Sequence, residues 1–237
     1  MSPRLVLFDI DGTLLSAGRI SARVFGEALL EAFGTTGDAE TFDYSGKTDP
    51  QIVRELMKGA GFSDEEIEKR RPGALEDYRA RLAAAIRPQD VAPKPGVPSL
   101  LDALAGVPDV TLALLTGNLG PTARLKLAPV DANRYFPFGA FGSDHEDRYQ
   151  LPRVARERAR DAVGVTFEGR EIVIVGDSIH DVLCGRDLGV RAVAVATGRT
   201  SLERLAEVGP DALLPDFSDT DATVSAILGS DGAGTPA

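Results

Sequence analysis

Short apolar runs, each followed by a polar or glycine-containing turn, limit the fold of this chain more than any other feature. Such continuous runs, separated by helix-like segments, are typical of strands buried on both faces of a parallel sheet. The sequence therefore predicts an α/β fold with a doubly wound parallel sheet. The clearest runs are rich in Val, Leu and Ile, two further runs are shorter, and together they cover residues 5–8, 110–115, 172–175, 192–196, 138–141 and 212–214.

A long insertion separates the first two predicted strands. It has roughly ninety residues, far more than the dozen or so that a plain crossover between parallel strands requires. Residues 18–90 contain no convincing strand, and apolar residues in this stretch recur at spacings of three and four, as in amphipathic helices. Asp49 as N-cap, followed by Pro50, predicts the start of one such helix, and Gly59 predicts its end.

These patterns predict a two-part organisation. A Rossmann-like α/β core would comprise residues 1–17 and 91–229, and residues 18–90 would form a small all-helical cap inserted into it. The proline-rich segment at 87–98 would mark the return of the chain to the sheet. Residues 230–237 lack apolar content and are expected to be disordered.

Composition narrows the range of partners and compartments. The formal net charge of -10 disfavours nucleic acid or an anionic membrane as a partner, because phosphate groups attract basic surfaces. Cys184 is the single cysteine, so no disulfide can form within the chain, and a reducing setting is expected. No apolar run reaches membrane-spanning length, and the first residues do not resemble a signal peptide. These features together predict a cytoplasmic protein.

The segment "FDIDGT" places Asp9 and Asp11 directly after the first apolar run. In open parallel sheets, ligands bind outside the carboxyl ends of the strands, so both carboxylates face the expected site. Two carboxylates there can bind a hard divalent cation, and one can attack phosphorus to form an aspartyl phosphate. The alternative is an ordinary turn, since Asp-Gly pairs are common turn signals.

Two further segments carry polar side chains at strand ends. In "LLTGN", Thr116, Gly117 and Asn118 offer a hydroxyl and backbone N–H groups for an anion, although strand-to-helix turns often contain these residues. In "GDSIHD", Asp177 ends a run and Asp181 lies one helical turn later, where a favourable helix dipole could explain either one alone. Four carboxylates at two strand ends would repel one another unless a cation bridges them. Without thiolates or paired imidazoles, the ligand set favours Mg²⁺ over Zn²⁺.

In this order, with a helical insert after the first, the segments "DIDGTL", "LLTGN" and "GDSIHD" resemble the phosphatases of the haloacid dehalogenase superfamily, in its phosphoglycolate-phosphatase-like branch. The resemblance implies that Asp9 is the nucleophile and Asp11 the general acid and base. It also implies that Thr116 anchors phosphate, with the neighbouring N–H groups. Mg²⁺ would be held by Asp9, the backbone carbonyl of Asp11 and Asp177, with Asp181 behind them.

One element of the resembling family differs here. A Lys is expected before the helix that leads into the last motif, but the segment "SDHEDRYQLPRVARERA" contains none. Arg148 is the predicted replacement, with Arg153 as the alternative. Arg binds phosphate through a planar fork where Lys offers a point charge, so the role can survive with altered geometry.

The expected function is a Mg²⁺-dependent phosphatase of small phosphorylated metabolites, with phosphoglycolate or a sugar phosphate as first candidates. A phosphomutase is the nearest alternative, because it would share every core residue. A phospho-accepting signalling receiver is less expected, because it would need no cap. A dehalogenase is also less expected, because halide leaves without a proton and would not require Asp11. Lys47 in "YSGKTDPQI" could pair with a carboxylate or second phosphate of the substrate, or simply be solvated. The oligomeric state is left open between monomer and homodimer.

Overall fold

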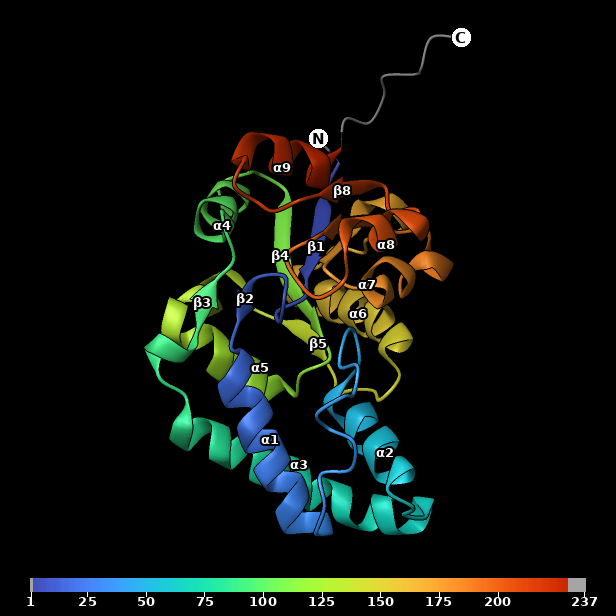
Figure 1. The fold of residues 1–237 in the computed structure, drawn as a ribbon. Helices are drawn as coiled ribbons and strands as arrows, with labels where there is room; N and C mark the ends of the chain where they lie inside the picture. Colours follow the sequence, from blue (N-terminus) through green and yellow to red (C-terminus); the bar gives the residue numbers. More distant parts are fainter. Residues whose placement is uncertain (1, 230–237) are drawn as a thin grey trace.

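Six parallel strands form a single sheet in the computed structural model, which describes residues 2–229 (Figure 1). The strand order is β5-β4-β1-β6-β7-β8, so the chain starts in the middle of the sheet and builds outward on both sides. The predicted doubly wound sheet is confirmed, and every predicted run lies in or overlaps a strand. The strands are β1 (Arg4–Phe8), β4 (Val110–Thr116), β5 (Gly139–Phe141), β6 (Ile172–Gly176), β7 (Arg191–Val195) and β8 (Ala212–Leu214).

Alternate residues of the strands are buried on opposite faces of the sheet. Val6 and Phe8 of β1 pack in the cluster that contains side chains of α4 (Val97–Ala105), α5 (Gly120–Leu127) and α9 (Thr220–Leu228). Leu5 and Leu7 pack on the other face, where α6 (Leu151–Val163) covers the sheet. Near the opposite edge, α7 (Ile179–Leu183) and α8 (Leu202–Glu207) contact β7 and β8. Helices on both faces explain why the strands read as continuous apolar runs.

The inserted segment is helical. It contains α1 (Gly18–Phe33), α2 (Asp49–Gly59) and α3 (Asp64–Ala85), which lie together below the sheet, toward the ends to which β1 and β4 run (Figure 1). Their apolar faces form a separate cluster that also includes Leu119 of the core, and in it the rings of Phe25 and Tyr78 meet edge to face at 5.0 Å. The division into a core and a cap domain at the boundaries given above stays a prediction.

Two details of the insert differ from expectation. The N-cap of α2 is Thr48, whose Oγ1 accepts a hydrogen bond from the backbone N–H of Gln51 at 3.2 Å, so the prediction of Asp49 as the cap was wrong by one residue. A two-stranded antiparallel ribbon of β2 (Leu15–Ser16) and β3 (Ala92–Pro93) joins the insert to the core, and two-residue strands leave no sequence pattern.

Two further predictions concerned membrane-spanning segments and the C-terminal tail. No helix in residues 2–229 combines the length and the apolar character needed to cross a bilayer. The tail predicted to be disordered, 230–237, lies outside the described residues.

Candidate functional site

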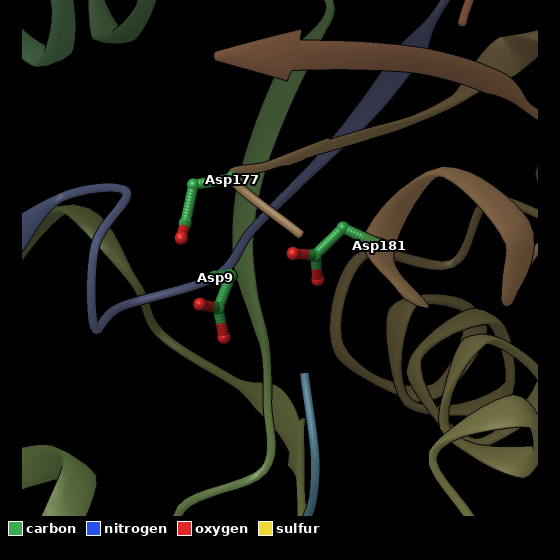
Figure 2. A group of neighbouring side chains, drawn as sticks. All are labelled: Asp9, Asp177 and Asp181. Atoms are coloured by element: carbon green, nitrogen blue, oxygen red, sulfur yellow. The ribbon is translucent and has the colours of Figure 1, made fainter. Parts of the chain in front are cut away.

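Three buried carboxylates meet at the carboxyl ends of neighbouring strands (Figure 2). Strands β1 and β6 pair in register, with Phe8 beside Val175, so Asp9 and Asp177 leave the sheet close together. Asp181 reaches toward both from α7 (Figure 2). One oxygen from each carboxylate lies within 4.8 Å of the others, and the three residues are only 2–8% exposed. The structure therefore brings together three of the four predicted carboxylates.

Local contacts fix two of these carboxylates. Asp177 Oδ1 accepts a hydrogen bond from Thr13 Oγ1 at 2.7 Å. Asp181 Oδ2 accepts bonds from the backbone N–H of Ser178 at 2.9 Å and from its hydroxyl at 2.6 Å. Gly12, at φ +93°, lets the turn after β1 approach closely, because a Cβ there would lie 2.5 Å from Asp177 Oδ2.

Arg148 lies against the carboxylate cluster. Its side chain is buried, and its Nη2 donates to Asp9 Oδ1 at 3.2 Å, to Leu115 O at 3.3 Å and to Asp181 Oδ1. Its Nε is also buried and has no hydrogen-bond partner within residues 2–229. Arg153, the alternative, pairs instead with Asp187 on the surface. The structure thus places Arg148, and not Arg153, beside Asp9.

The cluster is electrostatically unbalanced. Burial raises the pKa of Asp9 to about 7, with Arg148 opposing the shift and the carboxylates of Asp181 and Asp11 adding to it. Burial likewise holds the pKa of Asp177 well above its ordinary value, and Asp181 and Asp9 add to the effect. Three carboxylates beside one guanidinium carry two excess negative charges when ionised. A hard divalent cation would balance them, and an all-oxygen donor set fits Mg²⁺.

This imbalance predicts that the metal-free protein becomes less stable as pH rises through neutrality. Because the pKa of Asp9 is higher in the folded chain, the folded state binds the proton more tightly, and its stability is lost as pH rises through about 7. Through Asp9 alone, lowering the pH from about 8 to about 5.5 should therefore raise the unfolding free energy by about 2 kcal/mol. Thermal unfolding in EDTA measures the effect.

Two comparisons identify the share of this pH effect that comes from Asp9. The Asp9→Asn variant lacks this titrating group and should show a smaller dependence on pH, and the dependence that remains comes from other buried carboxylates, Asp177 among them. Added Mg²⁺ should raise the melting temperature most at pH 8, where the carboxylates are ionised. Equal pH profiles for the two proteins would contradict the assignment.

Asp11 lies beside the cluster rather than in it. Its Oδ2 accepts hydrogen bonds from Asn118 Nδ2 at 2.7 Å and from Lys126 Nζ at 2.6 Å. Asn118 Nδ2 also donates to Thr116 Oγ1 at 2.8 Å, so the hydroxyl predicted to anchor phosphate lies within this network. The carboxyl group of Asp11 is therefore held at the "LLTGN" loop, apart from the three clustered carboxylates.

Lys126 was missed by sequence reasoning. It lies on α5 beyond the "LLTGN" segment, and its ammonium also donates to Asn118 Oδ1 at 2.6 Å. Burial alone would lower its pKa, but the negative charges of Asp11 and Asp49 help to raise it above the ordinary value, so Lys126 stays charged. Its spacing from Thr122 and Ala123, which places it on their buried helix face, is the signal that could have identified it.

A cavity of about 390 Å³ extends from the carboxylates into the insert. The insert loop packs closely on the core here: the backbone N–H of Asp49 donates to Gly117 O at 2.8 Å, and a Cβ on Gly117 would lie 2.0 Å from Lys47 O. The core and the insert both contribute to the lining, which includes Asp9, Asp11, Thr116, Asn118, Lys126, Arg148, Asp177, Phe25, Lys47, Ile52 and Tyr78.

Lys47 is part of the cavity wall rather than a freely solvated residue. Its ammonium pairs with Glu55 and lies 4.3 Å from the centre of the Phe42 ring. His180 stands apart from the lining of the cavity, with its Nδ1 3.3 Å from the hydroxyl of Tyr149. Lys47 thus lines the cavity, whereas His180 is not among the residues that line it.

Two bacterial phosphatases are similar in sequence to this chain over most of its length. A phosphoglycolate phosphatase from Agrobacterium fabrum is 28% identical over 225 residues, covering 92% of this chain and 90% of that protein. Phosphoglycolate phosphatase 1 from Pseudomonas aeruginosa is 28% identical over 226 residues, covering 92% and 78%.

Solved structures share the fold at lower identity. A predicted phosphatase from Clostridium acetobutylicum superposes with a TM-score of 0.71 at 17% identity, covering 94% of this chain and 99% of that one. A candidate beta-phosphoglucomutase from Thermotoga maritima gives 0.60 at 18% identity, covering 94% and 99%. The family model of the haloacid dehalogenase-like hydrolases matches residues 6–195, from β1 to β7, and includes every carboxylate of the site. The chain belongs to the haloacid dehalogenase-like hydrolase family.

Proposed function

We propose that this protein is a Mg²⁺-dependent phosphatase of small phosphorylated metabolites that works through an aspartyl phosphate on Asp9. The observation that carries the proposal is the placing of Asp9 on the cavity wall, in contact with Arg148 and beside Asp177 and Asp181. The unpartnered Nε of Arg148 supports an anionic ligand, because a buried guanidinium N–H without an acceptor is unfavourable.

The residues divide the reaction into two displacements. Asp9 attacks phosphorus in line and the bond to the leaving oxygen breaks, while Asp11 gives that oxygen its proton. Asp11 then takes a proton from the water that attacks the aspartyl phosphate, which releases inorganic phosphate and regenerates Asp9. Arg148, Thr116 and the N–H groups after β4 would hold the phosphoryl oxygens.

The metal would be held by Asp9, the backbone carbonyl of Asp11 and Asp177, with Asp181 behind them. Mg²⁺ bound there would supply charge neutralisation for the nucleophile and the phosphoryl group. Asp181 already accepts hydrogen bonds from Ser178 and Arg148. We therefore place it behind the metal ligands rather than in direct contact with the metal.

The leaving group of the substrate would extend into the part of the cavity lined by the insert. The names of the curated relatives make phosphoglycolate the first candidate, and a sugar phosphate is the second. Lys47 would meet a carboxylate or a second phosphate of such a substrate, with its pairing to Glu55 exchanged for the ligand.

A phosphomutase is the second candidate function. The likeness to a candidate beta-phosphoglucomutase favours it only at the level of the fold. The two functions differ in where the phosphoryl group goes: a phosphatase transfers it to water, and a mutase returns it to a second hydroxyl of the sugar. A hexose phosphate incubated with a mutase would give an isomer and little free phosphate.

Phosphate release from a panel of phosphorylated metabolites, with p-nitrophenyl phosphate as a general probe, tests the proposal. We expect turnover that requires Mg²⁺, stops on addition of EDTA and returns when Mg²⁺ is restored. Phosphate should accumulate in step with loss of substrate. Isomer without phosphate would instead establish the mutase, and a chain inactive with the whole panel in Mg²⁺ would contradict both functions.

A further inference from the structure

The buried ammonium of Lys126 has no role in the mechanism described so far. Its side chain is only 5% exposed, although it ends at the wall of the cavity. Burying an ammonium costs free energy unless it is paired and hydrogen-bonded, so a lysine in this position needs compensating contacts. Those contacts are made with two residues of the motifs themselves, Asp11 and Asn118.

Asp11, Asn118 and Lys126 form a closed set of hydrogen bonds. Asn118 Nδ2 donates to Asp11 Oδ2 at 2.7 Å, Lys126 Nζ donates to the same oxygen at 2.6 Å, and Lys126 Nζ donates to Asn118 Oδ1 at 2.6 Å. The ammonium thereby also fixes which end of the Asn118 side chain faces Asp11, because the amide oxygen is taken by the cation. Removing Lys126 would take one hydrogen bond from each neighbour and would leave Asp11 Oδ2 with the Asn118 bond alone.

The two oxygens of Asp11 differ in their surroundings. Oδ2 accepts both bonds, whereas Oδ1 receives no hydrogen bond from any residue in 2–229. The Asp11 side chain is 41% exposed and lines the cavity, so one oxygen is anchored on the buried side and the other remains available. A group that transfers a proton must lie within hydrogen-bond reach of the oxygen that receives it, which makes its orientation decisive.

We propose that Lys126 is a positioning residue that anchors Asp11 through Oδ2 and so presents Oδ1 to the leaving group and to the attacking water. This inference rests on the proposed phosphatase function. In the first step the proton on Oδ1 moves to the leaving oxygen as its bond to phosphorus breaks. In the second, Oδ1 takes a proton from water as the aspartyl phosphate is hydrolysed.

The test compares two substrates that differ in their need for a proton. p-Nitrophenolate leaves readily as an anion, whereas the oxygen of β-glycerol phosphate needs protonation as it leaves. In Lys126→Met, kcat/KM for β-glycerol phosphate should fall about 100-fold, since general acid catalysis contributes at least about that factor. The value for p-nitrophenyl phosphate should fall less than about 5-fold. Because kcat/KM reports steps up to the first irreversible one, slow hydrolysis of the intermediate does not obscure the comparison.

Lys94→Met is the matched control. Lys94 lines the same cavity, but its Nζ donates to the backbone carbonyl of Thr197 at 2.6 Å rather than to Asp11. Its removal should change kcat/KM for both substrates by the same factor. Lys126→Arg, which keeps the charge and the donors, should recover most of the activity with β-glycerol phosphate. If Lys126→Met does not fold, Lys126→Gln, compared with Lys126→Arg, carries the same test.

The double variant with Asp11→Asn separates positioning from general loss of packing. If Lys126 acts through Asp11, adding Lys126→Met to Asp11→Asn should change kcat/KM by less than about 2-fold. Multiplying effects, or equal losses with both substrates in Lys126→Met alone, would overturn the inference while leaving the phosphatase function standing. If the wild type does not turn over β-glycerol phosphate, phosphoglycolate replaces it, because its alkoxide also needs a proton as it leaves. Inactivity of the wild type toward the whole panel of phosphorylated metabolites would instead overturn the function on which the inference rests.

Discussion

Replacing Asp9 by Asn should lower kcat for phosphate release by at least about 10⁴-fold, since loss of a nucleophile typically costs this much or more. Asn has nearly the same shape as Asp, but its amide does not attack phosphorus. The variant should fold well, because it removes one of three buried carboxylates that repel one another. Its metal-free form should therefore melt at or above the temperature of the wild type at pH 8.

A surface carboxylate provides the control for this substitution. Asp187 pairs with Arg153 away from the cavity, so Asp187→Asn makes the same chemical change and should leave kcat within about 2-fold. Rapid quenching of the wild type with labelled substrate should trap a phosphoryl group on Asp9 that Asp9→Asn never acquires. Undiminished turnover in Asp9→Asn would exclude the aspartyl phosphate, and a stable label without turnover would indicate a phospho-accepting receiver.

The strands could be predicted from the sequence because each carries its own signal. Residues 5–8 and 172–175 are buried on both faces, and a segment of that kind has to be apolar throughout. The strand order was not predicted, because it depends on which runs lie side by side, and nothing within a run specifies its neighbours. The ribbon of Leu15–Ser16 and Ala92–Pro93 was missed because two residues cannot show a periodicity.

Some residues of the site could be predicted from the sequence in the same way, and others could not. Asp9 and Asp177 follow strands directly, so the rule that parallel strands present their carboxyl ends at one edge brings them together. Asp49 was predicted as a helix cap but instead accepts a hydrogen bond from the backbone N–H of Leu119, a contact made between the insert and the core. Lys126 was missed for a similar reason: its spacing from Thr122 and Ala123 can indicate a shared helix face, but its contact with Asp11 depends on what packs around α5.

Arg148 is expected to be nearly as important as Asp9. Its guanidinium contacts Asp9 and Asp181, and both carboxylates are buried with it. Arg148→Met should lower kcat by about 10³-fold or more, because the buried donor proposed to hold the phosphoryl oxygens is lost. It should also destabilise the metal-free protein by about 3–5 kcal/mol, since removing one partner leaves buried charge uncompensated. Phosphate release and thermal unfolding in EDTA measure the two effects.

Mg²⁺ distinguishes the two roles of Arg148. The cation would neutralise the same carboxylates, so saturating Mg²⁺ should recover most of the lost stability of Arg148→Met but little of its activity, because the contact to phosphate is not replaced. Arg148→Lys keeps the positive charge as a point donor. In saturating Mg²⁺, where the two variants should have similar stability, it should retain more activity than Arg148→Met. Arg153→Met, in the exposed pair with Asp187, should change neither quantity appreciably. If Mg²⁺ restored full turnover to Arg148→Met, the guanidinium would serve only to balance charge, and the phosphate would have to be held by Thr116 and the backbone after β4.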